Sequence, residues 1–176
     1  MGAKECRPAW LVKDNMEKAA YEIRPLYRDE WADAMQLAWD MFLIFEAPEY
    51  SPEGIKNFQD FIKDPTLKKM FVRGQYQTLG AFIGRTIIGI LGVRNRSHIS
   101  LLFVEQEYHH QGVASALLKR LFQYARTEMD IHEMTVNASP YAVGFYHKLG
   151  FMDLGKEITT DGIRYTPMLI SLDERK

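Results

Sequence analysis

The sequence predicts an α/β fold of the α+β type, with one central mixed sheet that carries helices on both faces. Three runs rich in Ile, Leu, Val and Phe, at residues 77–83, 86–93 and 98–104, are joined by short connections and are typical of an antiparallel meander. A helical pattern then leads to another strand at 134–138, and this order implies a right-handed crossover and a parallel strand pair. With 176 residues, 47% of them hydrophobic, we expect one domain and about six to seven strands.

The N-terminal part is predicted to be helical after a short lead. Residues 1–20 are polar and form the predicted lead, and the domain is expected to span 21–176. An extended piece at 21–24 stops at Pro25, after which apolar residues recur at helical spacing between positions 31 and 42. We therefore predict that the first helix covers these positions.

Turn and cap residues set the next boundaries. Ser51 is a predicted N-cap, with Pro52 at the first position of a second helix that Pro65 is expected to end. The pair Gly84-Arg85 suits a tight hairpin between the first two strands of the meander. Each boundary is therefore predicted from the backbone preference of one or two residues.

The C-terminal part is expected to contribute one short helix and two strands. The helix is predicted from Pro140 to Lys148, with Gly150 ending it. Strands at 151–154 and 164–172 are expected around an Asp161-Gly162 turn. These two strands close the predicted sheet.

Composition and charge exclude several classes of function. The 22 basic and 23 acidic residues are spread along the chain and leave a net charge of -1, so no broad positive field favours nucleic acid or an anionic membrane as a partner. Cys6 is the only cysteine, which excludes an intramolecular disulfide. No apolar run approaches the roughly 20 residues that span a bilayer. We expect a cytoplasmic protein, and no metal, because the histidines lack partners at ligand spacing.

The junction between a strand and a helix near residue 112 carries the strongest functional pattern. A strand ending at Val104 runs into a polar loop that delivers Gly112, Ala114 and Ser115 to the start of an amphipathic helix. The first N–H groups of a helix lack internal partners and the helix dipole is positive there, so such a junction can hold a diphosphate. On these residues alone, an ordinary helix start is the alternative.

The same junction resembles the acetyl-CoA loop of the GCN5-related N-acetyltransferase (GNAT) superfamily, whose motif is Gln/Arg-x-x-Gly-x-Gly/Ala. Gly112 and Ala114 match this motif, while His109 stands at its Gln/Arg position. Residues 145–151, Phe-Tyr-His-Lys-Leu-Gly-Phe, resemble a second block of the family in the expected order. The resemblance covers roughly residues 21–172. It implies a GNAT-like fold, with a parallel strand pair that splays apart, and the use of acetyl-CoA.

The resemblance also implies a cofactor site. The pantetheine arm would slip between the splayed strands and bond to the backbone of the strand before the loop, with the Val104 N–H facing the thioester oxygen. Asn137 would bond pantetheine or a water, and Lys148 would reach a phosphate; a turn-forming Asn and a surface Lys are the alternatives. The expected cofactor-binding residues are Leu102, Phe103, Val104, His109, His110, Gln111, Gly112, Val113, Ala114, Ser115, Asn137 and Lys148.

Acid–base candidates follow from the same resemblance. Tyr146 matches the tyrosine implied to protonate the departing CoA thiolate, and a packing tyrosine is the alternative. An ungapped comparison with histone-type relatives places their catalytic glutamate at His98, which shares a predicted strand face with Ser100 and Leu102. Glu105 is the second candidate for the base that deprotonates the amine. A surface histidine and a solvated carboxylate are the respective alternatives.

The acceptor site is expected between the first two helices, where relatives vary. Phe45, Glu46 and Tyr50 would suit a cationic amine there, and an exposed acidic turn is the alternative. The expected activity is acetyl transfer from acetyl-CoA to a small-molecule or peptide amine by direct attack in a ternary complex. Many relatives dimerise, so a homodimer is expected by analogy.

Two other functions are alternatives to acetyl transfer. The first is an inactive acyl-CoA-binding sensor or partner module that has kept the cofactor loop. The second, a dinucleotide-binding protein, lacks the Gly-x-Gly-x-x-Gly fingerprint.

Overall fold

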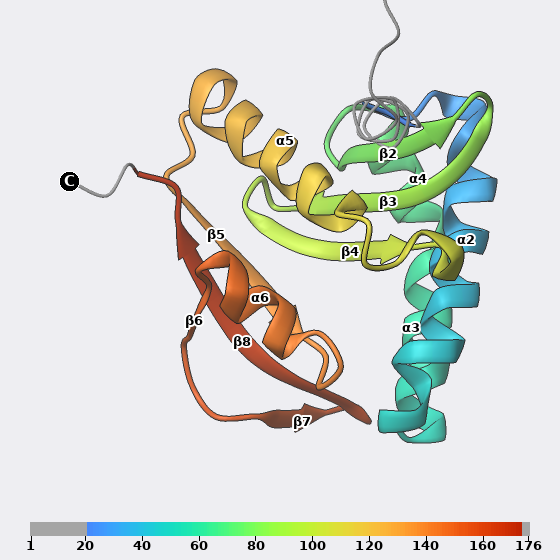
Figure 1. The fold of residues 1–176 in the computed structure, drawn as a ribbon. Helices are drawn as coiled ribbons and strands as arrows, with labels where there is room; N and C mark the ends of the chain where they lie inside the picture. Colours follow the sequence, from blue (N-terminus) through green and yellow to red (C-terminus); the bar gives the residue numbers. More distant parts are fainter. Residues whose placement is uncertain (1–20, 174–176) are drawn as a thin grey trace, which may run out of the picture.

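The computed structural model describes residues 21–173 and contains the predicted mixed sheet with helices on both faces (Figure 1). The strand order is β1-β2-β3-β4-β5-β8-β6, and β7 pairs with β8. The predicted lead, residues 1–20, lies outside the described residues. The strands are β1 (Glu22–Arg24), β2 (Gln77–Ile83), β3 (Thr86–Arg94), β4 (His98–Val104), β5 (Glu133–Ala138), β6 (Met152–Asp153), β7 (Ile158–Thr160) and β8 (Ile163–Ser171).

The helices form two layers, one on each face of the sheet (Figure 1). The apolar cluster on one face joins the first three helices to β2, β3 and β4, and the cluster on the other face joins the last two helices to β1 through β5 and to β8. This arrangement buries the helical stripes that the sequence predicts. The helices are α2 (Trp31–Phe45), α3 (Pro52–Lys63), α4 (Pro65–Val72), α5 (Val113–Glu128) and α6 (Val143–Leu149).

The region around Pro65 differs from the prediction, because this proline also begins a helix. Asp64 leaves the helical conformation after α3, and its Oδ1 accepts a hydrogen bond from the Thr66 N–H at 2.8 Å, which caps α4. Proline is tolerated there because the N–H that it lacks would have no partner in the first helical turn. The two apolar residues Leu67 and Phe71 that α4 buries were too few to indicate a helix from the sequence.

The strand β7 was also missed, although its turn was predicted. Asp161 and Gly162 both have positive φ, at 52° and 79°, which suits a tight hairpin between β7 and β8. All three residues of β7 are exposed, so this strand carries no buried apolar face that a sequence pattern would reveal.

The sheet divides where β4 and β5 part. These parallel strands pair only at the first two residues of β4, His98 and Ile99. The register between β3 and β4 then shifts so that Ser100 is an extra residue in β4. A bulge of this kind bends its strand, and Figure 1 shows β4 continuing beside β3 while β5 follows β8 away from it. The bulge also interrupts the alternation that was expected to place His98, Ser100 and Leu102 on one face.

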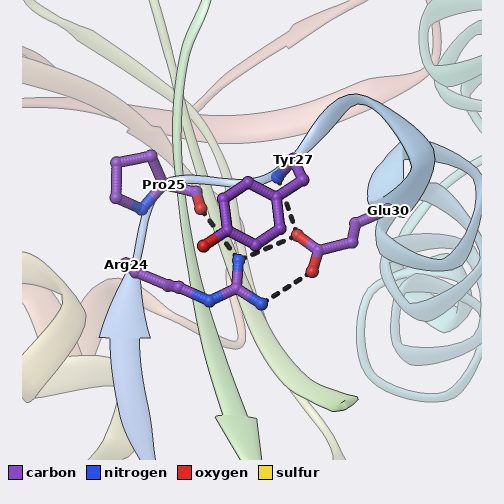
Figure 2. Close-up of polar contacts among 4 residues, drawn as sticks. All are labelled: Arg24, Pro25, Tyr27 and Glu30. Atoms are coloured by element: carbon purple, nitrogen blue, oxygen red, sulfur yellow. Dashed lines mark hydrogen bonds and ion pairs between the residues drawn. The ribbon is translucent and has the colours of Figure 1, made fainter.

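A shielded ion pair holds the chain where it enters the sheet (Figure 2). Arg24 binds Glu30 with two hydrogen bonds of 2.6 and 3.0 Å, and both side chains are 18% exposed. The Arg24 guanidinium also donates to the Pro25 carbonyl oxygen, and its carbon lies 4.1 Å from the Tyr27 ring centre and 3.8 Å from that of Phe82. The hydrogen bonds from Arg24 lower the pKa of Glu30.

We expect Glu30→Gln to reduce the free energy of unfolding by about 2 kcal/mol at neutral pH, because it removes a two-pronged charged contact and leaves the guanidinium between two rings. The pKa of Glu30 is lower in the folded protein than in the unfolded chain. The stabilisation from the Arg24–Glu30 contact is therefore present above the pKa of Glu30 in the unfolded chain, and it is lost as the pH falls through the pKa of Glu30 in the folded protein. Urea unfolding near pH 7 and in acid measures both effects.

The control variant is Asp60→Asn, which breaks the exposed Lys56–Asp60 pair of α3. Its expected cost is below about 0.5 kcal/mol. Equal losses for the two variants would contradict the structural role given to Arg24 and Glu30.

Candidate active site

Two pockets lie where β4 and β5 separate, and they share a wall. The α5 pocket, of about 660 Å³, lies against the start of α5 and against α6. The β4 pocket, of about 310 Å³, lies between β4, β5 and α3. The residues that line both pockets are Glu46, Leu102, Phe103, Ala142 and Tyr146. The two pockets are therefore adjacent at these residues, so molecules bound in them would lie close together.

The start of α5 offers free backbone donors to the α5 pocket. Gly112 caps the helix with φ of +80°, and His110 before it has φ of +59°, so the loop turns sharply into the helix. No hydrogen bond to another described residue satisfies the N–H groups of residues 110–115. Together with the positive end of the helix dipole, these donors can bind a diphosphate. Gln111 does not line the pocket, since its side chain donates to the Glu107 carbonyl oxygen.

The free edge of β4 supplies further backbone groups. Glu105 donates its N–H to the Ile88 carbonyl oxygen, on the β3 side. Because donors alternate along an antiparallel ladder, Phe103 also points its N–H and C=O toward β3, while Leu102 and Val104 point theirs toward the gap. This direction does not favour a cofactor contact by the Phe103 backbone, and the expected contact stays a prediction. Its side chain nevertheless lines both pockets.

His109, which stands at the Gln/Arg position of the motif, ties the loop between β4 and α5 to the end of β4. Its Nε2 lies 2.6 Å from the Val104 carbonyl oxygen, so Nε2 carries the proton and donates it. The imidazole also packs on Phe45, with the ring centres 4.7 Å apart. Both side chains line the α5 pocket, so the structure places Phe45 on that side and not in the β4 pocket.

Tyr146 stands between the two pockets. It is 4% exposed and packs edge-on against Phe145 and Phe151. Burial, with a smaller effect of the nearby Glu46 charge, raises the pKa of Tyr146 above its ordinary value. The phenol is therefore neutral near pH 7 and can donate its proton. Its hydroxyl has no hydrogen bond to the other residues of the described chain.

Glu46 is the acid at the junction of the two pockets. It follows the last residue of α2, and burial raises its pKa to about 7 against the opposing effect of the Ser139 hydroxyl. Ser139 is 4% exposed, and within residues 21–173 its Oγ has no hydrogen-bond partner. Glu46 was expected only to attract the amine. Its location and pKa also suit it to accept a proton.

The two predicted bases lie elsewhere. His98 lines the β4 pocket at the end remote from the shared wall, with Nδ1 2.8 Å from the Thr135 Oγ1. Burial, and then the charge of Arg94, lower the pKa of His98. Glu105 lines neither pocket. Neither side chain reaches the junction at which Glu46 is found.

The remaining predicted residues divide between the pockets. Lys148 lines the α5 pocket, whereas Asn137 and Tyr50 line the β4 pocket. Asn137 was expected to bond pantetheine or a water, but it does not line the α5 pocket, which has the diphosphate donors. Sequence reasoning did not select Arg94 or Ser139, which also line the β4 pocket. Only the folding of β3 and β5 around the bulge brings them to this wall.

Comparison with known proteins identifies the family. Residues 46–172 match the acetyltransferase (GNAT) domain. The chain belongs to the GNAT acetyltransferase family. Over 108 residues it is 32% identical to the "Uncharacterized N-acetyltransferase YafP" of Escherichia coli (strain K12). That match covers 61% of this chain and 65% of the relative, so it spans slightly less than two thirds of the relative's length.

Solved structures of the GNAT family share the fold. A GCN5-related N-acetyltransferase from Rhodopseudomonas palustris has a TM-score of 0.73 at 22% identity, covering 85% of this chain and 94% of that one. The PaiA N-acetyltransferase of Thermoplasma acidophilum, in complex with coenzyme A, has a TM-score of 0.69 at 25% identity, with coverage of 86% and 98%. Spermidine N-acetyltransferase from Vibrio cholerae, in complex with CoA and spermine, has a TM-score of 0.61 at 17% identity, with coverage of 88% and 96%.

Two further observations concern residues 21–173 only. None of their helices combines the length and the apolar character needed to cross a membrane. They also bring together no group of three or more His, Cys, Asp or Glu side chains that is suited to a metal ion. The expected absence of a metal, the cytoplasmic location and the homodimer stay predictions.

Proposed function

We propose that this GNAT protein transfers the acetyl group of acetyl-CoA to a primary amine by direct attack in a ternary complex. The observation that carries the proposal is the meeting of the two pockets at Glu46 and Tyr146. One pocket has the backbone donors of a diphosphate site, and the other reaches the same wall from the opposite side. Two substrates held in this way satisfy the proximity that a direct transfer needs.

The α5 pocket is the proposed acetyl-CoA site. The diphosphate binds the free N–H groups at the start of α5. The pantetheine arm lies along β4 and bonds to the N–H and C=O of Leu102 and to the N–H of Val104, because the Val104 carbonyl already accepts from His109. The Val104 N–H is the proposed donor to the thioester oxygen as negative charge develops there.

Glu46 and Tyr146 are the proposed acid–base pair. As its ammonium loses a proton to Glu46, directly or through one water, the amine nitrogen attacks the thioester carbon. The new C–N bond forms, the C–S bond breaks, and the sulfur leaves as a thiolate that Tyr146 protonates. The products are an N-acetylated amine and CoA. We favour Glu46 over His98 and Glu105 because it lines the shared wall.

The cofactor site is tested by Ser115→Glu and the neutral control Ser115→Gln. Ser115 lies in the first turn of α5, where a glutamate favours the helix but repels a diphosphate. We expect Ser115→Glu to raise the Kd for acetyl-CoA at least about tenfold over that of Ser115→Gln, with no loss of thermal stability. Calorimetry with acetyl-CoA measures the two affinities.

Two outcomes of this experiment would change the proposed function. Equal acetyl-CoA affinity of the two Ser115 variants would contradict the proposal that the diphosphate binds at the start of α5. Tight acetyl-CoA binding by the unaltered protein, without release of CoA thiol across a broad panel of amines, would favour the alternative of an acyl-CoA-binding sensor.

A further inference from the structure

The β4 pocket has opposite charges at its two ends. Among residues 21–173, Glu46 is the only acid that lines it, and Glu46 lies at the wall shared with the α5 pocket. Arg94 is the only lysine or arginine in the described part of the chain that lines it, and it is the last residue of β3, opposite His98 at the start of β4. The pocket therefore runs along β4 from a cationic end to an acidic end.

Arg94 is free to bind an anion. It is exposed, and among residues 21–173 its guanidinium has no ion pair or hydrogen bond, whereas Arg24 and Arg164 each bind carboxylates. Its guanidinium carbon lies 5.9 Å from the ring centre of Phe61, a residue that also lines the pocket, so the group is near the pocket wall. His98 beside it has a lowered pKa and adds no second charge near neutral pH.

The wall between the two ends combines aromatic and polar side chains. Tyr50, Phe58 and Phe61 contribute rings along which an apolar stem can lie, and the polar residues of the same lining are Asn57, Ser100, Asn137 and Ser139. The four residue-to-residue steps from His98 to Leu102 span about 13 Å along β4. An acceptor that contacts both Arg94 and Glu46 must bridge up to about this distance, less the lengths of the two side chains. A volume of about 310 Å³ fits a small molecule.

We propose that the acceptor is a small aminocarboxylate, whose amine faces Glu46 and whose carboxylate binds Arg94 across an apolar stem. This inference rests on the proposed function and names its substrate class. A polyamine of similar length fits this pocket poorly, because its second ammonium group would face the Arg94 guanidinium.

The test compares three acceptors with the same six-carbon stem: 6-aminohexanoate, hexylamine and 1,6-diaminohexane. Their far ends are anionic, neutral and cationic. We expect kcat/KM, measured by release of CoA thiol, to be roughly tenfold higher for 6-aminohexanoate than for the other two. Binding of each compound to the complex with CoA, measured by calorimetry, should follow the same order and needs no turnover.

Variants assign the preference to one residue. Arg94→Gln should abolish the preference for 6-aminohexanoate, and Arg94→Glu should transfer it to 1,6-diaminohexane. The control is Arg85→Gln, in the turn between β2 and β3. Arg85 is exposed and lines neither pocket, so this variant should leave the preference for 6-aminohexanoate unchanged. Retained acetyl-CoA affinity would show that the Arg94 variants are folded.

The outcomes separate this inference from the proposed function. Transfer to all three acceptors without a carboxylate preference, or with a preference for the diamine, overturns the inference and leaves the transferase proposal intact. Absence of thiol release with every amine counts against the transferase proposal. In that case the binding measurements decide the inference. Tighter binding of 6-aminohexanoate than of the other two compounds, lost in Arg94→Gln, still supports the inference, and equal binding of the three compounds overturns it.

Discussion

Replacement of Glu46 by Gln is expected to lower kcat by roughly 10²- to 10⁴-fold, the range associated with loss of a positioned general base. Glutamine keeps the size of the side chain but cannot accept the proton of the attacking ammonium. Glu46 lies outside the proposed diphosphate contacts, so the Kd for acetyl-CoA should change little. Release of CoA thiol at saturating acceptor, together with calorimetry, measures the two quantities.

The pH dependence identifies the group that titrates. Because the pKa of Glu46 is about 7, the carboxylate that acts as base forms as the pH rises through that value. The wild-type rate should therefore increase to a plateau above neutral pH, and the Glu46→Gln variant should lose this step. The control Glu49→Gln changes an acid of the same segment that pairs with Arg164 and lines neither pocket. A similar loss of kcat in that control would argue against a specific role for Glu46.

The same substitution should stabilise the fold in mild alkali. A rise of the Glu46 pKa from 4.5 to about 7 is equivalent to about 3 kcal/mol. The pKa of Glu46 is higher in the folded protein than in the unfolded chain. The stability contributed by the protonated acid is therefore fully present below the pKa of Glu46 in the unfolded chain, and it is lost as the pH rises through about 7. Glu46→Gln should therefore be more stable than wild type near pH 8, by up to about 3 kcal/mol, and equal to it near pH 4. Urea unfolding at the two pH values measures the difference.

We expect Gly54→Ala to lower the free energy of unfolding by at least about 2 kcal/mol, although alanine favours a helix over glycine by about 1 kcal/mol. A Cβ at this position of α3 would clash with the Gly162 carbonyl oxygen and lie 2.5 Å from the carbonyl carbon. The Gly162 carbonyl oxygen also accepts the Ser51 N–H, so the turn between β7 and β8 is tied to the start of α3. Two backbone segments would have to separate to admit one methyl group.

The control for this variant is Gly144→Ala, because the added Cβ meets no atom within 4 Å in α6. We expect it to be neutral or stabilising in urea unfolding. For Gly54→Ala we also expect a higher KM for the acceptor at unchanged acetyl-CoA affinity, since Asn57 of α3 and Ile163 of β8 both line the β4 pocket. A Gly54→Ala variant as stable as wild type would contradict the close contact.

Local patterns in the sequence determined most of the elements. Ser51 caps α3 by accepting from the Gly54 N–H, Gly84 and Gly150 take the positive φ expected of their turns, and the apolar stripe of α5 lies in the core. Each of these features depends on neighbours within a few residues, so the sequence alone can indicate it. The loop at Gly112 was found for the same reason, since its pattern is continuous in the chain.

The junction of the two pockets was decided by the tertiary structure. Glu46, Ser139 and Arg94 come from three separate segments, and they line one pocket only because the bulge at Ser100 turns β4 away from β5. The pKa of Glu46 depends on how closely distant parts of the chain surround its carboxyl group, which no local spacing specifies. The sequence therefore determined where an anion-binding loop lies, whereas long-range packing decided which acid and which arginine share a pocket beside it.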